Sequence, residues 1–225
     1  MAILDRPLPV AAFPLASGTI GDMRVETVLA RMFAAAQRPA NGGPHASGQR
    51  DPNLYADHGF SIQPEQGQLI YLLCRALRAR RVVEFATSVG VSTLYFAAAL
   101  RDNGGGLVIG SEIVPQKVAA ARRNLEDAGL AEFAQIREGD ARQTLRDLGG
   151  DIDFALIDGW PGDEGPSLAR ELIEIIAPQM QVGAIALNDN AEPDYLEWIR
   201  DPANGFRSVT LPLKGGTELS VKVEE

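Results

Sequence analysis

Apolar positions along the chain follow two different spacings. Before residue 81 they recur with helical spacing, about 3.6 residues per turn, which predicts amphipathic helices over residues 22–38 and 64–80. Beyond that point, short apolar runs bounded by Gly, Pro or acidic residues predict strands. The chain therefore begins with helices and continues with strands.

From residue 81 onward, predicted strands and helices alternate regularly. The strands cover residues 81–85, 107–111, 134–137, 152–157 and 183–187, and the helices between them cover 93–100, 115–128, 143–148 and 168–177. This alternation predicts a parallel sheet with helices on both faces. Several strands are apolar along their whole length, as expected when both faces of a sheet are covered.

The chain ends in a different pattern. A short predicted helix over residues 195–200 precedes two strand-like runs, 206–211 and 218–223, joined through Lys214-Gly215-Gly216. A short link that contains glycine favours a β-hairpin. We therefore expect an α/β fold with a doubly wound, mostly parallel seven-stranded sheet and an antiparallel C-terminal hairpin.

The residues before the sheet are less regular. Residues 1–21 are interrupted by Pro and Gly and predict an extended arm. The segment of residues 39–63 is longer than an ordinary connection between elements, so we expect either a functional lid or a disordered segment. We expect one domain, in which residues 1–63 form an arm, a helix and a lid-like loop, and residues 64–225 form the α/β core.

Composition narrows the functional classes. The formal charge of −9 over 225 residues disfavours a nucleic-acid partner. The single cysteine, Cys74, excludes an intramolecular disulfide and lies among leucines, as a core thiol does. No apolar run approaches the ~20 residues needed to span a bilayer, and no basic leader precedes the apolar N-terminal stretch. We expect a cytoplasmic protein without a membrane partner.

One stretch has the form of a ligand-binding turn. A β-branched run that contains Glu84 leads into small residues from Ala86 to Gly90, and then into an apolar helix. At the carboxyl end of such a strand, backbone N–H groups and a helix N-terminus face the crevice where ligands bind. The spacing Glu-x-Ala-x-x-x-Gly differs from the dinucleotide fingerprint. Alone, the stretch is equally compatible with a strand-to-helix turn that binds nothing.

Acidic residues stand at or just after the end of every strand in the parallel series. They are Glu84, Glu112, Asp140, Asp158 and Asp189. An acid roughly 20 residues after a small-residue loop can accept hydrogen bonds from both hydroxyls of a ribose, and Glu112 has that spacing. Each acid alone could also cap the helix that follows.

Asp158 and Asp189 form the sharper signal. If their strands are neighbours, the two strand ends lie about 5 Å apart. Carboxylates so close repel each other unless one is protonated or a cation lies between them. With the side-chain oxygen of Asn190 they form a set of hard ligands suited to Mg²⁺ or another divalent cation. Helix capping in solvent is the alternative for these residues.

Together these pieces resemble the class I S-adenosylmethionine-dependent methyltransferases. The resemblance is closer to the metal-dependent O-methyltransferase group that includes catechol and caffeoyl-CoA O-methyltransferases. The matching pieces are residues 62–67, 83–86 with Gly90, 112–113, 139–141, 153–159 and 189–190. A homodimer built on the N-terminal helices is implied by the resemblance alone.

The resemblance implies S-adenosyl-L-methionine as cofactor, with the ribose at Glu112 and the adenine between Asp140 and Ala141. It implies a divalent metal on Asp158, Asp189 and Asn190, and Asp158 is also the candidate catalytic residue. The candidate cofactor-binding residues are Glu84, Ala86, Thr87, Ser88, Gly90, Ser92, Glu112, Ile113, Asp140, Ala141, Asp158 and Trp160.

Our leading hypothesis is methyl transfer to one of two vicinal hydroxyls of a small molecule, with the metal lowering the pKa of that hydroxyl. Two residues depart from the family pattern. Ala86 stands at a usual glycine, and Pro161 stands where catechol methyltransferases have a general-base lysine. A metal-independent small-molecule methyltransferase and a non-catalytic nucleotide-binding protein are the alternatives. A nicotinamide dehydrogenase fits the loop spacing and the hairpin poorly.

Overall fold

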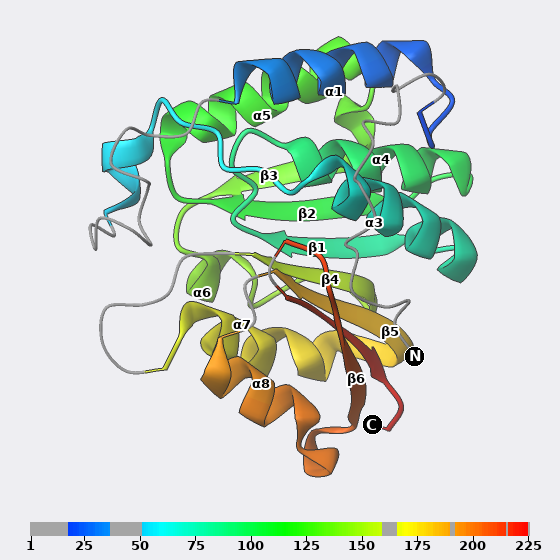
Figure 1. Ribbon diagram of the computed structural model, residues 1–225, viewed down its shortest axis with the longest axis vertical. Coiled ribbons are helices and arrows are strands. Elements are labelled where there is room, and N and C mark those ends of the chain that lie inside the picture. The colour runs from blue at the N-terminus through cyan, green and yellow to red at the C-terminus, as the bar shows by residue number, and fades with distance from the viewer. Residues whose placement is uncertain (1–17, 37–50, 159–165, 190–191, 215, 225) are drawn as a thin grey trace, which may run out of the picture.

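The computed structural model describes residues 18–36, 51–158, 166–189, 192–214 and 216–224. Within these ranges one seven-stranded sheet has the order β3-β2-β1-β4-β5-β7-β6 (Figure 1). β1 to β5 are parallel, and β7 pairs antiparallel with both β5 and β6. The strands are β1 Arg81–Phe85, β2 Leu107–Glu112, β3 Ala134–Glu138, β4 Ile152–Asp158, β5 Met180–Asp189, β6 Phe206–Leu211 and β7 Thr217–Lys222. The expected fold class is confirmed.

Helices cover both faces of the sheet (Figure 1). On one face lie α1 Met23–Ala35, α3 Pro64–Leu77, α4 Val91–Asp102 and α5 Pro115–Ala128. On the other lie α6 Ala141–Thr144, α7 Leu168–Ile176 and α8 Pro193–Arg200. Single 3₁₀ turns are η1 Pro52–Tyr55, η2 Ala131–Phe133, η3 Ala177–Gln179 and η4 Pro202–Asn204. Among the described residues, no helix is long and apolar enough to cross a membrane.

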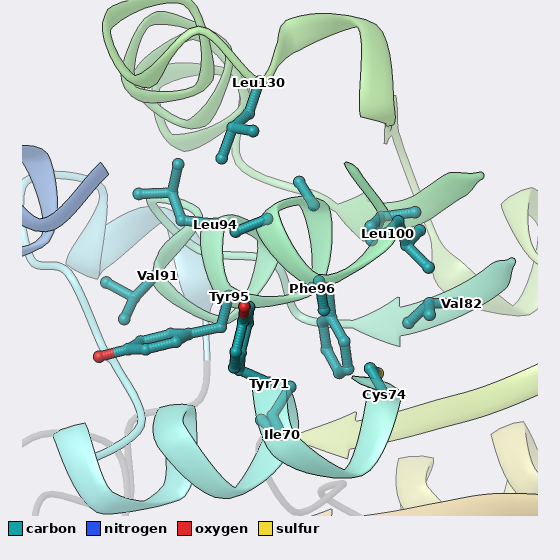
Figure 2. Packing of buried hydrophobic residues seen from close by; sticks show 14 of the residues in the cluster. Ile70, Tyr71, Cys74, Val82, Val91, Leu94, Tyr95, Phe96, Leu100 and Leu130 are labelled. Carbon is teal, nitrogen blue, oxygen red and sulfur yellow. The ribbon is translucent and has the colours of Figure 1, made fainter. Parts of the chain in front are cut away.

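The core on the first face is centred on α4, which is buried from Val91 to Leu100. Figure 2 shows this helix next to α3, with Tyr71 and Cys74 of α3 facing it. The ring of Phe96 meets that of Phe154 on β4 edge to face, with centroids 5.2 Å apart. Aromatic pairs of this geometry add to the stability gained by burial alone. The contact between Phe96 and Phe154 joins α4 to β4.

Two elements depart most from their predicted bounds. The helix expected over residues 143–148 is a single turn, because Arg137 donates to the carbonyls of Thr144 and Asp147, and the Leu148 N–H donates to Gln179. These donors and acceptors satisfy the groups that a longer helix would have paired. β5 begins before the predicted residue 183, and its pairing with β4 shifts register between Ile152 and Phe154.

The C-terminal strands are tied to α8 by a buried carboxylate. Arg200 on α8 donates from Nε and Nη2 to the two oxygens of Glu218 on β7, at 2.7 and 2.9 Å. Burial raises the pKa of Glu218, but the hydrogen bonds from Arg200 and Thr210 and the charge of Arg200 outweigh it, so the pKa lies below its usual value. The pair therefore stabilises the fold while Glu218 is ionised.

We expect Arg200→Met to lower the free energy of unfolding at pH 7 by about 1–3 kcal/mol, because a buried carboxylate loses its charged donor. Glu218 contributes this stability above its unfolded pKa, about 4.3, and loses it as pH falls through its lower folded pKa. The cost should therefore shrink at acidic pH. Urea denaturation at pH 7 and at about pH 4 measures both values.

The matched control is Arg207→Met on β6. Arg207 is exposed, and its ion pair with the exposed Glu224 is long, at 3.7 Å. Its loss should therefore lower the free energy of unfolding by less than about 1 kcal/mol. An Arg200→Met cost that is the same at both pH values would contradict the role assigned to Glu218.

Candidate functional site

The loop after β1 is a tight turn with left-handed backbone. Ala86, Ser88 and Gly90 have φ of 61°, 52° and 91°. The Thr87 N–H donates to the Ser111 carbonyl at 3.1 Å, which anchors the loop to β2. The φ of Gly90 favours glycine, and a Cβ there would lie in tight contact, 3.2 Å from the Cβ of Ala121.

The loop leaves a helix N-terminus open toward the ends of the strands. Gly90 is the N-cap of α4 and makes no side-chain cap, so backbone N–H groups of the first turn remain available. Glu112, buried at the end of β2, accepts from the backbone N–H groups of Ser88 and Val114 at 2.8 and 2.9 Å. A carboxylate has about four lone-pair positions, so Glu112 keeps acceptor capacity for a ligand hydroxyl.

Glu84 has a different environment from Glu112. Its two carboxylate oxygens accept from the hydroxyls of Ser92 and Thr93 in the first turn of α4, and its side chain is buried. Burial raises the pKa of Glu84, and these hydroxyls partly oppose that shift. Glu84 and Ser92 thus brace the turn between β1 and α4, and their contact with a cofactor stays a prediction.

The remaining candidates near the cofactor expected at this edge differ in exposure. Ile113 is 49% exposed and presents an apolar surface just after β2, while Ala141 is buried. Asp140 caps α6 and is bound by the Arg142 guanidinium, whose hydrogen bonds lower the pKa of Asp140. The carboxylate of Asp140 is therefore already paired within its own turn. Of these three residues, Ile113 therefore offers the exposed apolar surface against which an adenine ring could pack.

The described part of the predicted lid lies against the same loop. The Phe60 N–H donates to the Ser88 hydroxyl at 3.2 Å, and Tyr55 packs edge to face on Phe60 at 5.7 Å. The Lys117 ammonium lies 5.0 Å from the Phe60 ring centre. Burial lowers the pKa of Lys117, while the charge of Glu112 opposes that shift. Phe60 thus joins the loop to the start of α5. Residues 1–17 and 37–50 lie outside the described residues.

Asp158 and Asp189 are brought together as predicted. They are register partners at the ends of β4 and β5. Asp189 is buried, with Oδ1 accepting from Gln66 Nε2 at 2.8 Å and Oδ2 paired with the Lys214 ammonium. Burial and the charge of Asp189 raise the pKa of Asp158 to about 7, against the opposite effect of Lys214. The carboxylate pair already has a cation beside it.

Sequence reasoning missed three contributors to this cluster, namely Gln66, Glu192 and Lys214. Glu192 lies close enough for Asp189 to affect its pKa, which burial raises to about 7. Gln66 falls inside the piece 62–67 that carried the resemblance, which was the available signal. Lys214 was interpreted only as part of a hairpin link. Trp160, Pro161 and Asn190 lie outside the described residues. Among those described, no group of three or more acidic, His or Cys side chains could bind a metal.

The strand order and the antiparallel β7 are those of the Rossmann-like methyltransferase fold. Residues 83–191 match the family described as a methyltransferase domain. That segment includes the loop after β1, Glu112 and both aspartates. The resemblance to class I methyltransferases is thereby confirmed.

Catechol O-methyltransferases of Niastella koreensis and Mycobacterium tuberculosis are each 36% identical to this chain, over 113 and 100 residues. These matches cover 47% and 44% of this chain, and the chain spans about half the length of the curated relatives it matches, 50% and 44%.

Crystal structures show the same fold. A cofactor-bound protein from MTB superposes with a TM-score of 0.70 at 23% identity, covering 98% of this chain and all of that one. An O-methyltransferase from Bacillus cereus in complex with SAH gives 0.66 at 23% identity, covering 89% and 91%.

Ala86 generates a stability prediction. A left-handed φ costs an L-residue roughly 1–2 kcal/mol, so Ala86→Gly should gain up to about 1 kcal/mol after the added chain entropy of glycine. The matched control, Ala120→Gly within α5, should lose about 1 kcal/mol, because glycine is a poor helix former. Urea denaturation of both variants measures the two signs. A loss at Ala86 as large as at Ala120 would contradict the strained turn.

Proposed function

We propose that this protein is an S-adenosylmethionine-dependent O-methyltransferase that acts on a hydroxyl of a small molecule. The observation that carries the proposal is the arrangement along one sheet edge. The turn from Ala86 to Gly90 and Glu112 lie at the ends of β1 and β2, and Asp158 and Asp189 lie at the ends of the adjoining β4 and β5. The catechol O-methyltransferases named above and the SAH-bound neighbour support it.

The first part of this edge fits the cofactor. Bound S-adenosylmethionine supplies an electrophilic methyl group on a sulfonium. Glu112 accepts hydrogen bonds from ribose hydroxyls with the lone pairs that Ser88 and Val114 leave available. The N-terminus of α4 and the loop from Ala86 would hold the methionine part. The half-exposed Ile113 supplies apolar contact for the adenine.

The second part of the edge serves the acceptor. Asp158, partly exposed at the end of β4, would accept the proton of the acceptor hydroxyl. The acceptor oxygen would take the methyl group, and the electrons of the broken carbon–sulfur bond would stay on sulfur, which leaves as S-adenosylhomocysteine. The fixed sheet edge aligns the two reactants, which can be worth several kcal/mol. Asp158 is therefore the proposed catalytic residue.

The metal-assisted form of the reaction, expected from the sequence, stays a prediction. Asp189 is already paired with the Lys214 ammonium, whose charge opposes a second cation beside the same carboxylate, so the described residues do not fit a divalent ion as they stand. These contacts favour the alternative named from the sequence, a metal-independent small-molecule methyltransferase. We assign no step to a metal.

Cofactor binding is tested at Glu112. Glu112→Gln should weaken S-adenosylhomocysteine binding by about tenfold or more, because the amide places a donor where a ribose hydroxyl or a backbone N–H needs an acceptor. Isothermal titration calorimetry measures the dissociation constant. The control is Glu138→Gln, an exposed residue that is the register partner of Glu112 on β3. Equal affinities in both variants would remove Glu112 from the cofactor site.

Turnover is tested by incubating the chain with methyl-labelled S-adenosylmethionine and a panel of phenols and catechols, with Mg²⁺ and separately with excess chelator. We expect labelled methyl ether, and a loss of about 100-fold or more in Asp158→Asn while S-adenosylhomocysteine still binds. Cofactor binding without transfer to any acceptor would favour the non-catalytic alternative. Transfer that needs Mg²⁺ would restore the metal-assisted form.

A further inference from the structure

We propose that Lys214 is the resident cation of the Asp158–Asp189 pair and stands in place of a divalent metal. The Lys214 ammonium forms an ion pair with Asp189 Oδ2 and lies close enough to Asp158 to lower its pKa. The proposal concerns the acceptor side of the site and rests on the proposed function for its role in turnover.

Each oxygen of Asp189 has a donor in the absence of a metal. Oδ1 accepts from Gln66 Nε2 at 2.8 Å, and the same amide nitrogen also lies 3.2 Å from the Thr217 hydroxyl. Gln66 is itself fixed, because its Oε1 accepts from the Gln63 N–H in the capping box of α3. Asp189 is thus held by α3 on one side and by the hairpin on the other. A divalent ion at this buried carboxylate would have to lie beside the Lys214 ammonium.

The hairpin positions Lys214 by a strained backbone. Lys214 has φ of 51°, a left-handed conformation that favours glycine over lysine. Around it, the Gly216 N–H donates to the Leu213 carbonyl at 2.8 Å, and Thr217 pairs with Asp189 in the register of β7 with β5. The turn therefore ends beside the carboxylate pair. A side chain kept at a costly position, with its ammonium on a buried acid, indicates a role beyond closing the turn.

Charge makes the ammonium and a divalent ion mutually exclusive. Two cations within contact distance of one carboxylate repel strongly in a buried site. An ammonium also differs from a metal in what it can hold, because it donates hydrogen bonds and has no fixed coordination shell for two adjacent oxygens. The acceptor class that follows is a molecule with a single ionisable hydroxyl, such as a phenol, with no need for a vicinal diol.

Mn²⁺ binding to the full chain, followed by electron paramagnetic resonance, tests the assignment without any turnover. The wild-type chain should show no saturable site up to about 1 mM Mn²⁺. Lys214→Met should bind Mn²⁺ about tenfold or more tightly than wild type, because the carboxylate pair has lost its cation. Lys214→Arg, which keeps the charge, should behave like wild type.

The control for net charge is Arg207→Met on the neighbouring strand β6, which should leave Mn²⁺ binding unchanged. Adding Asp189→Asn to Lys214→Met should abolish the gained site. If Lys214→Met does not fold, Lys214→Gly gives the same readout with a residue that suits the left-handed turn. A saturable micromolar site in the wild-type chain, or equal binding in Lys214→Met and Arg207→Met, would overturn the proposal.

S-adenosylhomocysteine calorimetry in excess chelator separates this proposal from the proposed function. Wild-type binding in chelator supports both. Lost cofactor binding together with a Mn²⁺ site gained in Lys214→Met would overturn the methyltransferase proposal and leave the role of Lys214 intact. Retained cofactor binding together with tight Mn²⁺ binding in the wild type would overturn the role of Lys214 and leave the methyltransferase proposal intact.

Discussion

Two carboxylates at adjacent strand ends impose the central constraint on this molecule. The parallel register of β4 with β5 places Asp158 beside Asp189. Because Asp189 is buried, the negative charge of the pair needs a nearby positive charge or a proton. β7 provides it, because its antiparallel pairing with β5 returns the chain to the same edge and places Thr217 opposite Asp189. The turn that precedes β7 then brings the Lys214 ammonium onto Asp189. The strand topology thus also supplies the positive charge that balances the two carboxylates.

The acidic residues at the strand ends fall into two groups by their contacts. Glu84 accepts hydrogen bonds from the first turn of α4, Glu112 accepts one from the turn after β1, and Asp140 caps its own helix, so these carboxylates hold the segments around them. Asp158 and Asp189 instead lie side by side as register partners on neighbouring strands. Carboxylates therefore fix the loops at one part of this edge and concentrate negative charge at the other.

α3 links the core to this edge. Its Tyr71 and Cys74 pack against α4 (Figure 2), while Gln66 in its first turn reaches Asp189 on β5. A helix fixed along its length by apolar contacts can hold one amide in place for a buried acid. The site is thereby supported by the packing that stabilises the domain.

The sequence by itself determined the parallel sheet, the terminal hairpin and the meeting of Asp158 with Asp189. Periodicity reports which residues form strands, and the carboxyl ends of parallel strands converge at one edge. The sequence also indicated Glu112 as a candidate site residue, through its spacing from the loop after β1, and the structure shows that Glu112 contacts this loop. Only the tertiary structure decided the partners of Asp189, because Gln66 lies 123 residues away in the chain and Lys214 reaches it through a left-handed turn. Such contacts depend on how elements pack and on single backbone angles, neither of which leaves a repeating pattern in the sequence.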